Sequence, residues 1–391
     1  MFLPLLRLFQ CFLLFGFCSS SSISYENLNI AIVSGYGKMP RNVQIELQRS
    51  LIWFKNAISV RKFEKSITST ELLNVYPKFS WINIQTAEKA QDLHVNSLEF
   101  AKLLEMSNFV ILINRDIQKC QIDSELLANA KPLTPEGLNR PKFAIMNVCQ
   151  NFQFSNFFDL FRHEILHALG FGLFIPFEDS IPNRYYNWWT PKGTQNVSQI
   201  FMDFSKRAKR VVSSHFNCST IFGVEADGFK KNHLNEYIFG NELMTPNLES
   251  GQNYFSEISA AILEETYFGE KPWYKVNRKY TIEESQKYWY GKNFGCNFIK
   301  FSCWKFLETA GNKLTFPFCS INNERYCLIT PTYKIRLSLK NCQQTFNHQT
   351  QITENGLKAF PGATFSNSIH RFCPIDKNFI NIPKNHRIEL C

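Results

Sequence analysis

The fold of this chain is decided by the stretch His163-Glu164-Ile165-Leu166-His167-Ala168-Leu169-Gly170-Phe171. Two histidines four residues apart lie on one face of an α-helix, one turn apart, so both imidazoles can reach the same metal ion. A glutamate beside them can act as a base next to that ion, which is typical of hydrolytic zinc sites. The stretch therefore predicts a zinc-binding helix with His163 and His167 as ligands and Glu164 as the catalytic base.

The residues around this motif predict how the helix is anchored. Apolar residues recur on the side opposite the histidines, at Phe158, Phe161, Ile165 and Leu169. This spacing is typical of a helix whose back packs in a core. Ser155 is the expected N-cap, and Gly170 is the expected end, because glycine accepts the left-handed conformation there. The alternative is a buried helix whose two histidines are only hydrogen-bonded.

Composition excludes several classes of protein. A chain of 391 residues can form one large domain or two to three smaller ones, and its 38 phenylalanines indicate a globular core. The formal net charge is +10, but the Lys and Arg residues are scattered and form no long run. We therefore expect no nucleic-acid partner, and we interpret the excess charge as a general property of the surface.

The first 22 residues resemble an export signal. They contain one basic residue, Arg7, within an apolar stretch that ends in a Ser-rich segment. The stretch is short and Gln10 interrupts it, which favours a cleaved signal over a membrane anchor. No second apolar span follows, and the last residues, Ile388-Glu389-Leu390-Cys391, lack the apolar tail of a GPI signal. We expect a secreted protein with no stable membrane span.

Cysteine usage agrees with export. Of the 12 cysteines, Cys11 and Cys18 fall inside the expected signal, and the ten that remain can form disulfides. Cys120 and Cys149 are isolated from the others, so we predict that they pair. A zinc site made of cysteines is the competing hypothesis, but the chain has no C-x-x-C pair to support it.

Two triplets match the acceptor pattern for N-linked glycans. They are Asn196-Val197-Ser198 and Asn217-Cys218-Ser219. Both would be used only if the chain enters the secretory pathway. They predict exposed positions in a glycoprotein.

Hydrophobic patterns along the chain predict a mixed fold. The expected strands are residues 30–33, 109–113 and 143–148, and the expected helices are residues 42–61 and 256–268 besides the motif helix. Strands that alternate with helices favour a small α/β subdomain capped by the motif helix. Residues 171–232 show no regular spacing of apolar residues, and we interpret them as an insertion packed against the active-site cleft.

A catalytic zinc site needs a third protein ligand. The compact metzincin signature would place a histidine at position 173, where the chain has Leu173. A gluzincin-like site would use a downstream glutamate, Glu257 or Glu265. His233 is the better candidate, because Asn241-Glu242-Leu243-Met244-Thr245-Pro246 follows it, and a methionine in a tight turn after the third histidine completes the metzincin signature.

On these residues the chain resembles the leishmanolysin (invadolysin) family of zinc metalloproteases. In that family a long insertion separates the glycine of the first half-motif from the third histidine, as residues 171–232 do here. Further resemblance lies in residues 138–149, 273–277 and 290–296, so that it covers about residues 109 to 303. One departure is that no cysteine precedes Cys120 after the signal, so the cysteine-capped pro-segment of the family is not expected here.

The resemblance implies an α+β metzincin-type fold with four segments. These are a signal peptide (1–22), an N-terminal catalytic subdomain (23–170), a central subdomain with the insertion (171–294) and a cysteine-rich C-terminal region (295–391). It also implies that one zinc ion is held by His163, His167 and His233, above a turn formed by Met244.

The resemblance implies a mechanism as well. Zinc lowers the pKa of a bound water from about 15.7 toward about 7. Glu164 would take the proton of the water and pass it to the leaving amine. An extended peptide would add to the edge of the sheet, which we place at residues 143–148.

The expected function is that of a secreted, monomeric zinc endopeptidase acting on proteins or peptides. Two alternatives stay open at this point. One is a secreted adhesion or surface-binding protein that keeps the protease fold without catalysis, against which the intact Glu164 argues. The other is the gluzincin-like peptidase with a glutamate as third ligand.

Overall fold

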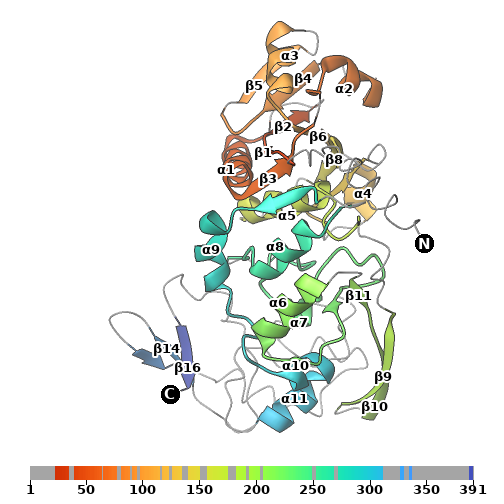
Figure 1. Ribbon diagram of the computed structural model, residues 1–391, viewed down its shortest axis with the longest axis vertical. Helices are drawn as coiled ribbons and strands as arrows, with labels where there is room; N and C mark the ends of the chain where they lie inside the picture. The colour runs from red at the N-terminus through yellow and green to blue at the C-terminus, as the bar shows by residue number, and fades with distance from the viewer. Residues whose placement is uncertain are drawn as a thin grey trace, which may run out of the picture.

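A computed structural model describes most of the chain between residues 23 and 310. The described segments are 23–34, 39–63, 65–76, 81–88, 90–94, 97–114, 117–122, 126–133, 140–149, 156–174, 182–190, 193–202, 206–248, 252–267, 272–310, 326–329, 334–336 and 387–390. The expected signal, Ser155 and most of the cysteine-rich tail lie outside them. The described part mixes helices and strands, as expected (Figure 1).

A six-stranded sheet forms one end of the molecule (Figure 1). In spatial order its strands are β5 (Ala90–His94), β4 (Trp81–Gln85), β2 (Ile30–Ser34), β6 (Phe109–Asn114), β8 (Phe143–Val148) and β7 (Ala128–Pro132). The three strands predicted from sequence, β2, β6 and β8, run parallel in its middle. They carry apolar residues on both faces, and such continuous apolar runs can be recognised in the sequence.

One prediction about this sheet is wrong. We expected residues 143–148 to form its edge, but β7 pairs antiparallel with β8 and forms the edge itself. The β7 sequence Ala-Asn-Ala-Lys-Pro lacks the β-branched and aromatic residues that mark strands. Its proline is tolerated because an edge strand need not donate every hydrogen bond.

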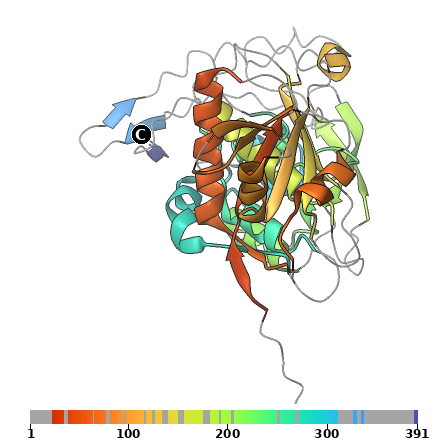
Figure 2. The ribbon, with the colours of Figure 1, turned by 90° about the horizontal axis from the view of Figure 1, so that it is seen from above.

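Helices cover both faces of the sheet. Ile30, Ile32 and Ile111 point to the side of α1 (Arg41–Ala57) and α5 (Phe157–Ala168). The alternate residues, such as Ala31 and Val110, pack with α2 (Ser69–Val75) and α3 (Leu98–Glu105). Figure 2 shows α1 lying along the side of the sheet. The motif helix α5 is therefore anchored from above by a buried sheet.

The first helix is shorter than predicted. We expected a helix over residues 42–61, but α1 ends at Ala57, and Ile58–Arg61 form strand β3. β-branched residues at alternate positions explain this change. β3 lies between β1 (Tyr25–Asn27) and β13 (Tyr274–Val276), so it joins the start of the chain to a segment more than 200 residues away.

The insertion is more regular than its sequence suggested. It contains a hairpin of β9 (Arg184–Thr190) and β10 (Gly193–Gln199), then β11 (Phe201–Met202), α6 (Lys206–Phe216) and β12 (Val224–Glu225). The remaining elements are α4 (Ile117–Ile122), α7 (Glu236–Phe239), α8 (Glu257–Glu264), α9 (Arg278–Lys287), α10 (Cys296–Lys300), α11 (Cys303–Ala310), β14 (Tyr326–Ile329), β15 (Lys334–Arg336) and β16 (Arg387–Leu390). The helix predicted at residues 256–268 is α8, with Ser256 as its N-cap.

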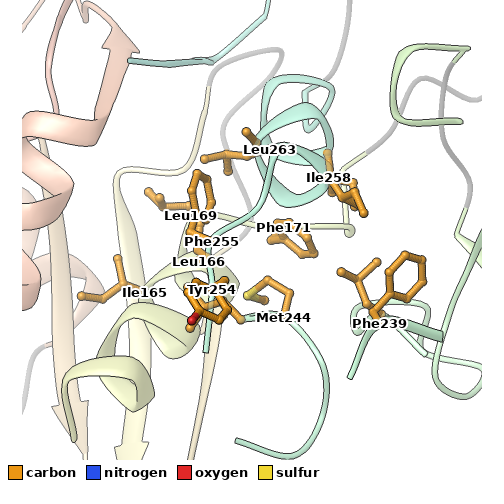
Figure 3. Packing of buried hydrophobic residues seen from close by; sticks show 14 of the residues in the cluster. Ile165, Leu166, Leu169, Phe171, Phe239, Met244, Tyr254, Phe255, Ile258 and Leu263 are labelled. Carbon is orange, nitrogen blue, oxygen red and sulfur yellow. The ribbon is translucent and has the colours of Figure 1, made fainter. Parts of the chain in front are cut away.

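One apolar core connects the sheet and α5 to the part of the chain that follows α5. Side chains from α5, from α8 and from the loop before α8 belong to one cluster, and Figure 3 shows Leu166, Met244 and Ile258 among its members. The site described below lies beside this core.

Two disulfides tie the described part together. Cys120–Cys149 forms as predicted, and Cys218–Cys296 crosses the boundary that we expected at residue 295. Among the described residues, the helices are all too short or too polar to cross a bilayer.

Candidate metal centre

Helix α5 begins and ends with defined caps. The side chain of Asn156 accepts a hydrogen bond from the N–H of Asp159, so the cap lies one residue after the predicted Ser155. At the other end Gly170 has φ +91°, and a Cβ there would lie 2.4 Å from the Phe174 ring. Glycine is therefore required at this turn, which leads the chain away from the helix directly after His167.

Three histidines converge beside α5. The Nε2 atom of His167 lies 3.0 Å from that of His163 and 2.8 Å from that of His233, and the third pair is 3.2 Å apart. His163 and His167 are buried, and His233 is partly buried. The structure thus brings together the two histidines of the motif and the downstream histidine singled out from sequence.

A backbone carbonyl fixes the proton of His163. Its Nδ1 atom lies 2.7 Å from the oxygen of Leu243. A carbonyl oxygen can only accept, so Nδ1 carries the proton and the Nε2 lone pair points into the cluster. This is the tautomer that a metal-binding histidine needs.

The surroundings keep the imidazoles neutral. Burial lowers the pKa of His163 to about 4, although the carbonyl of Leu243 partly opposes it. Burial also lowers the pKa of His233 to about 3, with the charges of His163 and Lys230 adding to the effect. Burial also lowers the pKa of His167, and the neighbouring imidazoles of His233 and His163 lower it further. Neutral imidazoles are the form that binds metal ions.

The insertion holds His233 in place. Its carbonyl accepts a hydrogen bond from the N–H of Asp227 at 2.9 Å, and the next residue, Leu234, bridges to Ala226 just after β12. The N–H of Leu234 donates to the carbonyl of Met244 at 2.9 Å. The sequence did not predict strand β12. The contacts that follow this strand hold His233, which lies 66 positions after His167, against α5.

Met244 lies in a tight turn. The N–H of Thr245 donates to the carbonyl of Glu242, and Met244 occupies the third position of that turn with its side chain fully buried. The turn also presents Leu243, whose carbonyl contacts His163. Met244 therefore lies in the element that supports the histidine cluster.

Glu164 is buried next to two of the histidines. Burial raises the pKa of its carboxyl to about 8, and a hydrogen bond from the backbone N–H of Ala130 in β7 partly opposes that rise. Its second oxygen, Oε2, is buried and has no hydrogen-bond partner among the described residues. A carboxyl with a pKa near neutrality and a free oxygen is suited to take and return a proton.

The two glutamates considered as alternative ligands are bound elsewhere. Glu257 forms an ion pair with Arg278 at 2.8 Å, and the carboxylate of Glu265 accepts a hydrogen bond from the N–H of Ala208. Within the described part of the chain, the cluster that could hold a metal ion consists of His163, His167 and His233.

The donor set fits a zinc ion. Zinc–nitrogen bonds of about 2.0–2.1 Å in tetrahedral geometry hold ligand nitrogens about 3.3 Å apart, close to the spacing of the three Nε2 atoms. The buried Nδ1 of His167 has no partner among the described residues, so no hydrogen bond there selects one of its two tautomers. Nitrogen lone pairs held this close repel one another, and a cation between them relieves that repulsion.

Sequence reasoning missed a buried ion-pair network on α5. Arg162 is 1% exposed and pairs with Asp159 and Glu284, and it also donates to the carbonyl of Asn253 at 3.0 Å. The spacing of Asp159 and Arg162 was the available signal, but such i, i+3 pairs are usually solvated. Here the network ties α5 to α9 and to the loop before α8.

Comparison with known proteins shows the family of this chain. The family model described as Leishmanolysin matches residues 117–385, which is more than half of the chain. The chain belongs to the leishmanolysin family. The curated proteins that it resembles are named leishmanolysin-like peptidases.

Similar proteins carry the same family name. A leishmanolysin-like peptidase of Caenorhabditis elegans is 24% identical over 57% of this chain and 39% of its own length. One from Drosophila pseudoobscura pseudoobscura is 24% identical over 72% of this chain and 48% of its own length, and one from Drosophila melanogaster is 25% identical over 56% and 37%. The chain thus spans less than half the length of these relatives.

Proposed function

We propose that this protein is a zinc endopeptidase in which His163, His167 and His233 hold the metal ion. The observation that carries the proposal is the convergence of their three Nε2 atoms within 3.2 Å. Zinc, when bound, supplies Lewis-acid activation of water and of the scissile carbonyl. The protein supplies neutral imidazoles and a carbonyl that orients one of them.

Glu164 is proposed as the general base and acid. Its carboxylate takes the proton of the attacking water, and its carboxylic acid returns that proton to the leaving amine. Burial raises its pKa to about 8 in the metal-free protein, and the positive charge of a bound zinc ion would favour the carboxylate, which is the form that takes a proton. Substitution of such a group lowers rates by about 10²- to 10⁴-fold.

Strand β7 is proposed to hold the substrate backbone. Hydrogen bonds from Leu133 to Phe143 and from Cys149 to Leu127 mean that alternate residues, including Ala128 and Ala130, point their backbone groups away from β8. An extended peptide can pair by strand addition with the backbone groups of Ala128 and with the carbonyl of Ala130, whose N–H already donates to Glu164. Pro132 offers only a carbonyl at its outward position.

The test compares four proteins for zinc content and casein cleavage. Wild type should hold one zinc and cleave, Glu164→Ala should keep zinc and lose activity, and His233→Ala should lose both. Glu257→Ala is the matched control and should keep both, since Glu257 pairs with Arg278. Full activity in Glu164→Ala would refute the role of the base. Loss of zinc in Glu257→Ala with retention in His233→Ala would indicate the gluzincin-like site.

Secretion is part of the proposal. The two disulfides support it, because such bonds persist in oxidising compartments. Asn196 and Ser198 are exposed on β10, and Asn217 is exposed after α6, so both acceptor asparagines are accessible. The intact mass of the protein secreted by a eukaryotic host tests this. We expect loss of about 22 residues and a mass that falls on enzymatic deglycosylation, whereas retention of residues 1–22 would contradict it.

A further inference from the structure

Glu242 carries a fully buried carboxylate that the proposed mechanism does not use. Its Oε2 atom accepts a hydrogen bond from the N–H of Met244 at 2.6 Å. Its Oε1 atom accepts from the N–H and the hydroxyl of Ser256 at 3.1 and 2.8 Å. Burial raises the pKa of this carboxyl, and these hydrogen bonds oppose that rise. Backbone and hydroxyl donors therefore hold a buried acid in a single orientation.

Ser256 links this carboxylate to α8. The serine hydroxyl donates to Glu242 and accepts from the N–H of Ile258, which makes it the N-cap of the helix. The N-terminus of a helix favours a nearby negative charge, because its free N–H groups and its dipole are positive there. Glu242 is thus fixed against a helix whose body lies in the core.

On its other side Glu242 fixes the turn that carries Leu243 and Met244. The turn closes through a hydrogen bond from Thr245 to the carbonyl of Glu242, and the N–H of Leu243 donates to the carbonyl of Tyr254 at 2.8 Å. These contacts leave the peptide group of Leu243 little freedom. Its carbonyl is the group that accepts from His163.

We propose that Glu242 is a positioning residue for the metal centre, which clamps the Glu242–Thr245 turn to α8 and thereby sets the orientation of His163 through the carbonyl of Leu243. The inference rests on the proposed function, since it assumes that His163 binds zinc. Removing the hydrogen-bond partner of a metal-binding histidine typically lowers metal affinity or activity by about 10- to 100-fold. Glu242 acts one step behind such a partner, so we place the expected effect at about 10-fold.

The chemistry of the clamp makes Glu242→Gln the informative change. A carboxylate offers an acceptor oxygen on each side, whereas an amide offers one oxygen and one NH2 group. In the glutamine variant the NH2 group must face a backbone N–H, either that of Met244 or that of Ser256. The size of the side chain is unchanged, so a loss of function reports the lost acceptor and not a cavity.

Glu264 provides a matched control at the other end of α8. Its carboxylate accepts from the N–H of Val276 at 2.8 Å and pairs with Arg207 and Arg278. Glu264→Gln therefore perturbs the same helix through the same chemical change, but at the end away from the turn. We expect it to lower stability without changing zinc affinity.

The experiment measures the zinc Kd by chelator competition, together with kcat, KM and the melting temperature of the metal-free proteins. Glu242→Gln should raise the Kd and lower kcat by about 10-fold each with KM within about twofold, while Glu264→Gln leaves the Kd unchanged. An unchanged Kd in Glu242→Gln, or an equal rise in Glu264→Gln, would overturn the inference.

Two further outcomes are decisive. If Glu242→Gln does not fold, Ser256→Ala removes one donor to the same carboxylate, and it should still raise the zinc Kd, whereas an unchanged Kd counts against the inference. If wild type binds no zinc, the proposed function itself fails. If wild type binds zinc and Glu242→Gln binds it equally well, only the positioning role fails.

Discussion

At the scale of the residue, the buried carboxyl of Glu164 makes the stability of the metal-free protein depend on pH. Burial raises its pKa to about 8 in the folded protein, from 4.5 in its ordinary state. Between these two values the unfolded chain has ionised this group while the metal-free fold has not. The group therefore lowers the stability of the metal-free protein as the pH rises through this window, by about 1.4 kcal/mol per unit at most.

We predict that Glu164→Gln removes this pH dependence. Relative to wild type, the metal-free variant should gain stability steadily from pH 4.5 to pH 8, because the amide does not titrate. Melting temperatures of both proteins, measured with a chelator at pH 4.5, 6 and 8, check this. The histidine titrations are common to both proteins and cancel in the difference. A difference that stays constant with pH would contradict the account.

Sequence was most informative where the chemistry lies within one helical turn. His163, Glu164 and His167 were identified from their spacing, because helical geometry fixes that spacing in space. His233 and Met244 were singled out by the metzincin signature, in which a methionine turn follows the third histidine, and the family resemblance supported them, since helical geometry does not connect residues so far from α5. Glu242 was not predicted at all, because its partner Ser256 is reached only through the folded loop.

At the scale of the element, α5 differs from the one-sided helix that we predicted. Its apolar side packs in the core as expected, but its polar side is buried as well. Arg162 is buried there together with Asp159 and Glu284. Removing one partner of a buried ion pair destabilises a protein by about 3–5 kcal/mol, because the remaining charge is left uncompensated.

We therefore predict that Arg162→Ala lowers the free energy of unfolding by about 3–5 kcal/mol. Arg49→Ala is the control, because Arg49 forms the same i, i+3 kind of pair with Glu46 on the exposed face of α1 and should cost less than about 1 kcal/mol. Urea denaturation of the two variants and wild type measures both effects. Equal losses in the two variants would show that the Arg162 network is not a structural link.

The central strands could be predicted from sequence, whereas β7 and β12 could not, and the difference has a physical reason. The central strands of the sheet carry β-branched and apolar residues, and the sequence marks them clearly. The edge strand β7 is held by its pairing with β8 and not by its own propensity. The short strand β12 likewise exists only because it pairs with β11. Tertiary pairing of this kind leaves no local signal.

At the scale of the whole molecule, disulfides link segments around the site. Cys120–Cys149 joins α4 to the end of β8, and Cys218–Cys296 joins the end of α6 to α10, over 29 and 78 residues respectively. Only the first pair could be predicted, because its cysteines are isolated in the sequence. The second pair draws on a crowded set in which spacing does not select a partner.

We predict that the double substitution Cys120→Ser and Cys149→Ser lowers the free energy of unfolding by about 3–4 kcal/mol. The disulfide closes a loop in the unfolded chain, and opening a loop of this length raises the conformational entropy of that chain by a corresponding amount. The zinc content should stay at one per chain, because neither cysteine belongs to the histidine cluster. Thermal melting and metal analysis of the double variant check the two parts. An unchanged melting temperature would contradict the first part, and a loss of zinc would contradict the second.

The central claim is that one zinc ion is held by three histidines drawn from α5 and from the segment after the insertion. X-ray absorption at the zinc edge of the purified protein tests it most directly. The account predicts three imidazole nitrogens and an oxygen at about 2.0–2.1 Å. A sulfur ligand near about 2.3 Å, or a shell with two imidazoles, would contradict it.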